Sequence, residues 1–266
     1  MSEIGSALLV FVLLLVSTGL GVWVRPLLPE EHKAHETVQL VQLVIGMLVT
    51  FAALVLGLMT ASAKSSFDTA ENDLRAYAAD ITELDMTLRD YGSDTDAARK
   101  LLRVYMAAAI ASTWPGEPAP PGEYPKDLVS PGDSQTLESV QLGEMLTSVG
   151  RQLRQLRARD PLQQRTLNDA LAQFRRVVDA RWKIIEEVHS SISQPFFKTL
   201  TFWLCVIFLS FGLIAPRNAL ALVTISLGAV SIASAIYVIV DLDTPLTGPI
   251  VISSEPMRDA LAHLTP

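Results

Sequence analysis

The sequence predicts an all-α, four-pass membrane protein in which two transmembrane hairpins flank a cytoplasmic helical insert. Three observations lead to this prediction. Half of the 266 residues are hydrophobic and the mean hydropathy is +0.34, yet 18% of the residues are charged. The apolar residues gather in four long runs, and the polar residues gather in one block between the second and third runs. A soluble domain would be less apolar, and a pure membrane bundle would carry fewer charges.

The four apolar runs cover residues 4–24, 38–63, 196–214 and 219–240. Each has about the ~20 residues that a helix needs to cross ~30 Å of hydrocarbon. In lipid the backbone must satisfy its own hydrogen bonds, so the runs must be helical. We therefore expect a first transmembrane hairpin in residues 1–63, an insert in 64–194 with a proline-rich loop at 115–133, a second hairpin in 195–240, and a tail with a short helix in 241–266.

The first run is interpreted as a retained helix, because no basic leader precedes it. Lysine and arginine near the ends of the runs predict the orientation, since they are more frequent on the cytoplasmic side. The side that holds the insert and both termini carries Lys64, Arg75, Arg181, Lys183, Lys198 and Arg258, and the other side carries Arg25, Lys33 and Arg217. Both termini are therefore expected in the cytoplasm, with the chain in the inner (plasma) membrane.

Apolar residues at alternating spacings of three and four predict three helical seams in the insert. The first starts directly after the second run, so that helix is expected to continue into the insert until Tyr91-Gly92 breaks it. The seams contain Phe67, Ala70, Leu74, Tyr77, Ile81, Leu84 and Leu88; then Leu142, Leu146, Val149, Leu153 and Leu156; then Leu167, Leu171, Phe174, Val178, Trp182, Ile185 and Ile192. The third leads to Pro195, where a kink is expected before the third run.

Several function classes find no support. The phosphate-loop, dinucleotide, hydrolase-elbow and zincin motifs are missing, so we expect neither an enzyme nor a cofactor. The net charge of −7 argues against nucleic-acid binding. Two metal-like groupings have simpler interpretations. His32 and His35, with Glu31 and Glu36, fit polar residues facing lipid headgroups. Glu186 and His189 lack the second Glu-x-x-His of a di-iron bundle and fit a solvated helix face.

Small and polar residues recur every three or four positions along the second run. They share one face of the expected helix: Gln39, Gln42, Gly46, Thr50, Ala53, Gly57 and Thr60. We call this set the small-polar stripe. It favours either a pore-lining face or close packing between helices, which small residues also promote. No run carries a charge in its middle, so a proton relay or voltage sensor is not supported.

The tail has an unusual density of acidic, proline and serine residues, notably Asp241, Asp243, Pro245, Gly248, Ser254 and Pro256. The Ser253–Pro256 stretch predicts the start of a helix, with a serine cap and a proline in the first turn. Asp241 and Asp243 could hold a cation at a channel mouth, but a solvated end of the fourth helix is the favoured interpretation.

Four segments resemble the bestrophin-like membrane proteins of bacteria. These are Asp-Leu-Asp-x-Pro-Leu-x-Gly from 241, Ile-Ser-Ser-Glu-Pro-Met-Arg-Asp-Ala-Leu from 252, the stretch 57–68, and Phe-Gly-Leu-x-Ala-Pro-x-Asn from 211. Leu246 stands where phenylalanine is expected. The resemblance covers nearly the whole chain. It implies a homo-oligomeric ion channel in a bacterial inner membrane, in contact with membrane lipid. The channel is expected to conduct anions such as chloride through a pore lined by the second transmembrane helix.

The alternative is a non-conducting signalling or scaffold protein whose seams carry helix movements from the membrane to the cytoplasm. The small-polar stripe discriminates between the two. It should face a shared cavity in a channel, and it should be buried within its own subunit in a scaffold.

Overall fold

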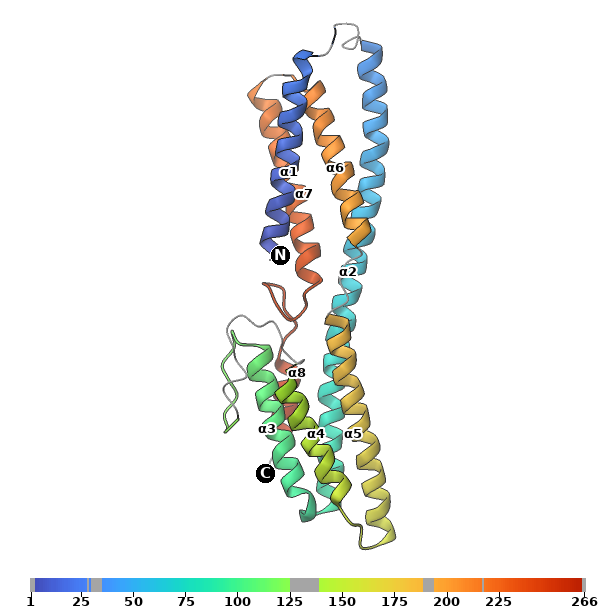
Figure 1. Ribbon diagram of the computed structural model, residues 1–266, viewed down its shortest axis with the longest axis vertical. Coiled ribbons are helices and arrows are strands. Elements are labelled where there is room, and N and C mark those ends of the chain that lie inside the picture. Colours follow the sequence, from blue (N-terminus) through green and yellow to red (C-terminus); the bar gives the residue numbers. More distant parts are fainter. Residues whose placement is uncertain are drawn as a thin grey trace. The chain divides into compact units, whose positions relative to one another are not determined.

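The computed structural model describes residues 3–27, 29, 35–124, 139–188, 194–216 and 218–264. In these residues the regular secondary structure is entirely helical (Figure 1), which confirms the all-α prediction. The chain divides into two compact units. The apolar unit comprises Met1–Phe67 and Ser190–Ile250, and the polar unit comprises Asp68–His189 and Val251–Pro266.

Within the described residues, four helices are long and apolar enough to cross a membrane. They are α1 (Glu3–Val24), α2 (His35–Tyr91), α6 (Gln194–Ile214) and α7 (Ala219–Leu242). A short 3-10 turn, Arg25–Leu27, follows α1. In each apolar window only 17–33% of the residues are buried inside the subunit. The remaining apolar surface would be costly to expose to water, and it suits lipid or a second subunit.

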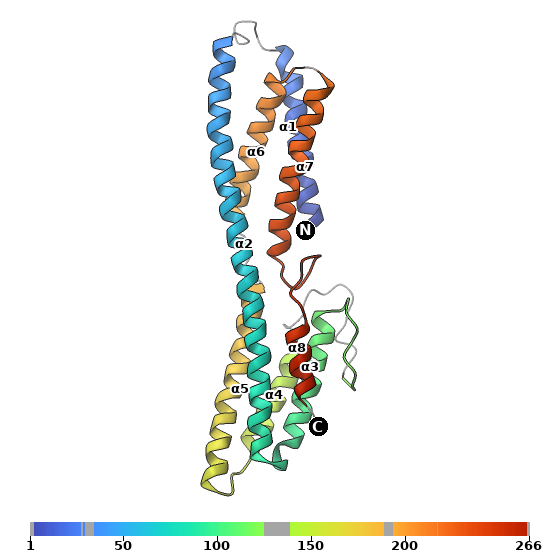
Figure 2. The same ribbon diagram turned by 180° about the vertical axis from the view of Figure 1, so that it is seen from behind.

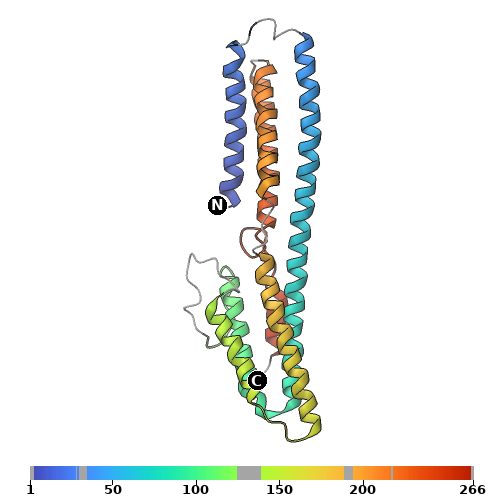
Figure 3. The same cartoon turned by 45° about the vertical axis from the view of Figure 1, so that its right-hand side comes forward.

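Helix α6 separates the first two apolar helices (Figure 3). On one side its Trp203 ring lies 6.4 Å from the ring of Phe51 on α2. On the other side α6 crosses α1 with the two backbones in direct contact at Gly21 and Gly212. A Cβ placed on either glycine would overlap backbone atoms of the opposite helix. Only glycine permits this approach, and close backbone approach is a main source of attraction between helices in lipid.

Helix α2 is a single helix of 57 residues that ends at Tyr91, as the uninterrupted seam predicts. In the polar unit its seam residues Leu74, Ile81, Leu84 and Leu88 are almost completely buried. A 3-10 turn, Ser93–Thr95, leads into α3 (Asp96–Thr113), followed by α4 (Val140–Gln155), α5 (Pro161–Val188) and α8 (Glu255–His263). Helix α3 contacts α4 and α8, and α4 contacts α5 (Figure 2).

The predicted seam of α5 is wrong at several positions. Leu171 and Val178 are only half-buried and Trp182 is 57% exposed. The helix instead buries Ala170, Val177, Arg181 and Ile184 beside Leu167, Phe174 and Ile185. The prediction followed the largest apolar side chains, whereas the observed face accepts an alanine and an arginine. Ile192 lies outside the described residues.

One smaller expectation is also wrong, and another is not tested. Leu156, expected at the end of the α4 seam, follows the last residue of α4 and is half-buried. Pro195 lies in the first turn of α6 (Gln194–Ile214). The kink expected between α5 and α6 falls on a junction that the structure does not describe, so it stays a prediction. Residues 189–193, between α5 and α6, lie outside the described part.

Ion pairs connect α2 and α5 along the polar unit. Lys183 Nζ lies 2.7 Å from Asp73 Oδ1, and an Arg176 guanidinium nitrogen lies 2.7 Å from Glu83 Oε2. Glu187, one turn beyond Lys183, faces the same aspartate. Burial, together with a hydrogen bond and charge repulsion from Asp73, raises the pKa of Glu187 from 4.5 to about 7.

The raised pKa predicts a pH dependence of stability. The folded state keeps the Glu187 proton up to about pH 7, whereas the unfolded chain releases it near its ordinary pKa of 4.5. Unfolding therefore becomes easier as the pH rises through this window. A Glu187→Gln variant should show a flatter dependence of the unfolding midpoint on pH between the two values. Glu186→Gln is the matched control, and an equal flattening in both variants would contradict the assignment.

Candidate functional site

The apolar part of α2 presents three different faces, because an α-helix turns about 100° per residue. Ile45, Ala52 and Met59 form the first face, each with at most 8% of its surface exposed. These residues hold α2 against the rest of the apolar unit.

The small-polar stripe occupies the second face, roughly 120° around the helix from the buried one. All seven of its residues are exposed in the subunit. A Cβ built on Gly46 or Gly57 meets no atom within 4 Å. The hydroxyls of Thr50 and Thr60 donate to carbonyls of their own helix, at 2.9 and 2.8 Å. Packing inside the subunit therefore does not account for this face.

The third face of α2 is apolar throughout. Leu40, Leu43, Met47, Leu54 and Leu58 are each 57–65% exposed. Such side chains suit lipid tails. The two exposed faces of one helix differ sharply in chemistry, which indicates that they meet different surroundings.

Part of the stripe also borders a cavity inside the apolar unit. Gln42 and Gly46 line a mostly apolar space of about 640 Å³ together with Phe211 of α6 and Thr224 of α7. Asn218, in the turn between α6 and α7, lies at its edge and accepts a hydrogen bond of 2.7 Å from the Ala221 amide. Thr50, Ala53, Gly57 and Thr60 do not border this cavity.

The first half of the tail motif is a compact loop closed by Asp241. This side chain is fully buried, and its Oδ2 accepts the Ile250 amide proton at 3.0 Å. Pro245 and Leu246 are also buried, and Gly248 has a φ of 91°, which favours glycine. The expectation that Asp241 is solvated is therefore wrong. Its carboxylate closes the loop, because a nearby backbone amide replaces water as its partner.

The second half of the motif binds α8 to the segment that follows α3. The Trp114 indole N–H donates to the Ile252 carbonyl at 2.8 Å. The Ser254 hydroxyl donates to the Glu117 carboxylate, which also accepts from Arg258 Nε at 3.0 Å. We call these five residues the tail clamp. Ser254 is the N-cap residue of α8 and Pro256 lies in its first turn. The Ser254 hydroxyl bonds to Glu117 of the tail clamp and does not cap a backbone amide of the helix.

Sequence reasoning missed Trp114, Glu117 and Arg258 as a set. Trp114 was given no role, Glu117 fell in the expected proline-rich loop, and Arg258 served only to predict orientation. Their separation by about 140 positions leaves no local periodicity to reveal the contact. The one available signal was the density of polar residues in the tail.

A buried polar cluster was also missed in the polar unit. The hydroxyls of Tyr77 on α2 and Tyr105 on α3 lie 2.5 Å apart, and both side chains are fully buried. Arg181 of α5 is only 4% exposed and donates to the Ser139 carbonyl at 3.3 Å. Burial raises the pKa of both tyrosines, with the positive charge of Arg181 opposing the shift. Both hydroxyls therefore stay neutral and join α2 to α3.

The structure does not test the two metal-like groupings. Glu31, His32 and His189 lie outside the described residues, as does the side chain of His35. Among the side chains that the structure describes, no group of three His, Cys, Asp or Glu residues could hold a metal ion.

Comparison with known proteins assigns the family. The model of the bestrophin-like domain matches residues 11–257. The chain belongs to the bestrophin-like domain family. Solved structures agree with this assignment. A bacterial bestrophin homologue from Klebsiella pneumoniae aligns with a TM-score of 0.63 and 17% identity, over 99% of this chain and 97% of that one. An isoleucine-to-threonine variant of a Klebsiella pneumoniae homologue aligns at 0.62 and 18%, over 99% of both chains.

At this low identity the structural likeness extends to the fold alone. A search of functionally curated proteins returned no match. The family assignment rests on the chain as a whole, and it includes both halves of the tail motif up to Met257.

Proposed function

We propose that this bestrophin-like chain is one subunit of a homo-oligomeric channel for inorganic ions, with the small-polar stripe of α2 lining the pore. The observation that carries the proposal is the exposure of the whole stripe beside an apolar face of the same helix. Two glutamines on a lipid-facing surface would be unfavourable, whereas water in a shared pore would solvate them. Gly46 and Gly57 leave space where several copies of α2 approach an axis.

The proposed selectivity is for anions such as chloride. It follows from the kinship with bestrophins. The tail agrees with it, because Asp241 is buried and bonded to the Ile250 amide and so is not displayed as a cation-attracting charge at a mouth.

Cysteine substitution tests the pore assignment. In a Cys205→Ser background, Ala53→Cys and Gly57→Cys should react with a membrane-impermeant thiol reagent, and the reaction should block chloride flux from liposomes. Leu54→Cys and Leu58→Cys are matched controls at the same depth on the lipid-suited face, and they should be protected.

Equal protection at all four positions, together with no ion flux from reconstituted protein, would exclude the channel. That result would favour the non-conducting scaffold, for which the unbroken α2 provides a mechanical connection. Flux without modification at the stripe would retain the channel and move its pore elsewhere.

The proposal includes an orientation in the bacterial inner membrane. Residues 64–194 and the tail 241–266 lie in the cytoplasm, with both termini, because lysine and arginine are more frequent on that side. Alkaline phosphatase inserted after Tyr124 should be inactive, and green fluorescent protein at the same place should fluoresce. Active phosphatase there would reverse the orientation.

A further inference from the structure

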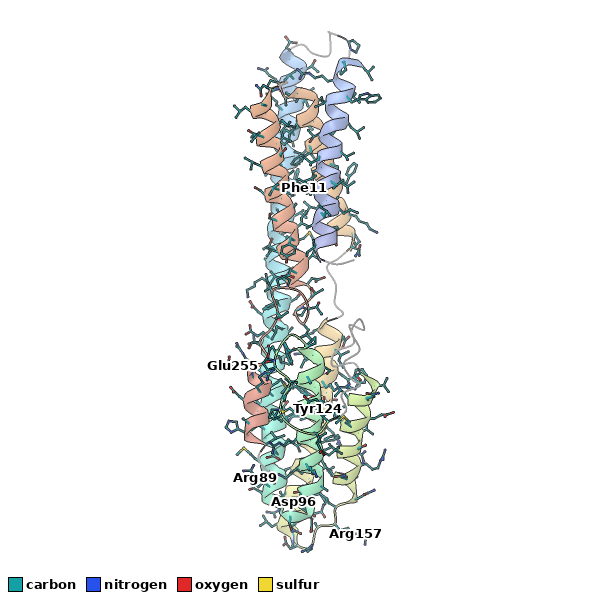
Figure 4. The ribbon with its side chains drawn as sticks, turned by 90° about the vertical axis from the view of Figure 1, so that its left-hand side faces the viewer. Phe11, Arg89, Asp96, Tyr124, Arg157 and Glu255 are labelled. Carbon is teal, nitrogen blue, oxygen red and sulfur yellow. The ribbon has the colours of Figure 1, made fainter. Side chains whose placement is uncertain are left out.

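The cavity of about 640 Å³ in the apolar unit has a use that the stripe does not explain. Its described lining residues come from α2, α6, α7 and the turn between α6 and α7. Helix α1 packs against α6 and α7, and Figure 4 shows it beside α7, with Phe11 labelled on α1. The volume falls within the range of ligand sites, roughly 300–1,000 Å³.

Most of the cavity is apolar and lies within the membrane-length helices. Among the described residues no charged side chain lines it, and its apolar walls include Ile45, Phe208, Phe211, Ile214, Ile225 and Gly228. Apolar cavities stay dry, and an empty one forfeits the dispersion contacts of its lining. The lining therefore favours an apolar occupant over water or an ion.

One end of the cavity is polar. Asn218 lies there, and its Oδ1 accepts the Ala221 amide proton at 2.7 Å, which leaves the Nδ2 group for another acceptor. A guanidinium nitrogen of Arg25 donates to the carbonyl of the lining residue Ala215 at 2.5 Å. Because a guanidinium carries five N–H donors, Arg25 has the capacity for a further acceptor beside this end.

The polar and apolar parts follow one another along α7. Gly228 lies ten residues beyond Asn218, which corresponds to about 15 Å of helix, and Phe208 borders the cavity at that depth. An occupant with a polar head and an elongated apolar chain matches this order. A phosphodiester fits the polar end, because arginine forms charge-assisted hydrogen bonds with phosphate oxygens.

We propose that this cavity holds one acyl chain of a membrane phospholipid, whose phosphodiester bonds to Arg25 and Asn218 and whose chain lies against Phe211 and Ile225. The bilayer that surrounds these helices supplies such chains directly. The lipid fills the space between α2 and the α6–α7 hairpin. The site does not depend on ion conduction, so its test requires no current.

The test uses the full chain, freed of lipid in a neutral maltoside detergent, and native mass spectrometry. The probes are palmitoyl-oleoyl phosphatidylglycerol and palmitoyl-oleoyl glycerol, which has the same chains and no phosphate. The phospholipid should bind saturably, with one molecule per subunit binding first. The glycerol should bind at least about tenfold more weakly, because it cannot form a charge-assisted hydrogen bond. This comparison needs no variant to fold.

Variants locate the site. Thr224→Phe places a ring in the lining and should weaken binding of the phospholipid by about tenfold or more, and Arg25→Gln should do the same. Val223→Phe is the matched control. Val223 is the preceding residue of α7, lies outside the lining and is 53% exposed, so this variant should bind the lipid like the unchanged protein.

Three results would overturn the proposal: no saturable phospholipid, equal binding of the glycerol, or unchanged binding in Thr224→Phe. The same spectra report the number of subunits. If a second subunit filled the cavity instead, the unchanged protein would bind no lipid there and Thr224→Phe would alter the mass of the assembly.

Discussion

Replacing Trp114 with alanine is expected to destabilise the polar unit and release the tail. The indole is 4% exposed and donates to the Ile252 carbonyl, so the change removes a large buried ring and leaves a carbonyl without its donor. Truncations of this kind cost ~3–5 kcal/mol. Equilibrium unfolding should show the loss, and trypsin should cut at Arg258, where the unchanged protein is protected by its bonds to Glu117 and Pro118.

Two other variants separate the contribution of the indole hydrogen bond from that of the buried ring. Trp114→Phe keeps most of the buried area and loses only the hydrogen bond, which should cost about 1–3 kcal/mol. Trp182→Ala makes the same chemical change at a side chain that is 57% exposed, so its effect should stay within ~0.5 kcal/mol. Cleavage at Arg103 of α3 at the same rate as at Arg258 would indicate global unfolding. A Trp114→Ala protein as stable as the original would disprove the clamp.

Alanine at Gly212 is expected to push α1 and α6 apart. The added methyl group would overlap the Thr18 carbonyl and the Gly21 backbone on α1. Backbone atoms cannot rotate away as a side chain can, so the helices must separate and lose close contact along their crossing. Overpacking costs ~1–3 kcal/mol of stability in protein interiors. We expect a loss near the upper end of this range, because the neighbouring atoms belong to the backbone of α1.

Gly21→Ala should behave in the same way, since its added methyl group would overlap Leu209 and Gly212 of α6. Gly19→Ala is the matched control. It lies two residues away on α1, and a Cβ there meets no atom within 4 Å. The stability of all three variants is measured by unfolding with sodium dodecyl sulfate in mixed micelles. Alanine has a higher helix propensity than glycine, so Gly19→Ala should not lose stability. A loss at Gly19 equal to that at Gly212 would contradict the role of the crossing.

Local patterns sufficed for most of the helices. The four apolar runs, the long α2 and its break at Gly92 all follow from hydropathy and periodicity, because these depend on neighbours within one or two turns. The same reasoning placed the small-polar stripe on one face of α2. It failed on α5, where Ala170 and Arg181 are buried and Trp182, which was expected to be buried, is exposed. The prediction followed the size of the apolar side chains, which favours Trp182 over Ala170 and excludes the charged Arg181.

The sequence alone determined that this is a helical chain with four membrane-length runs, a polar block and the motifs of the bestrophin-like family. Only the tertiary structure decided which surfaces remain open and which polar groups are used. It showed that α6 separates α1 from α2, that all seven stripe residues are exposed in the subunit, and that Asp241, Trp114 and Glu117 hold the tail segments in place. Helix periodicity is a property of adjacent turns, whereas burial and hydrogen bonding between residues more than a hundred positions apart depend on how the whole chain packs.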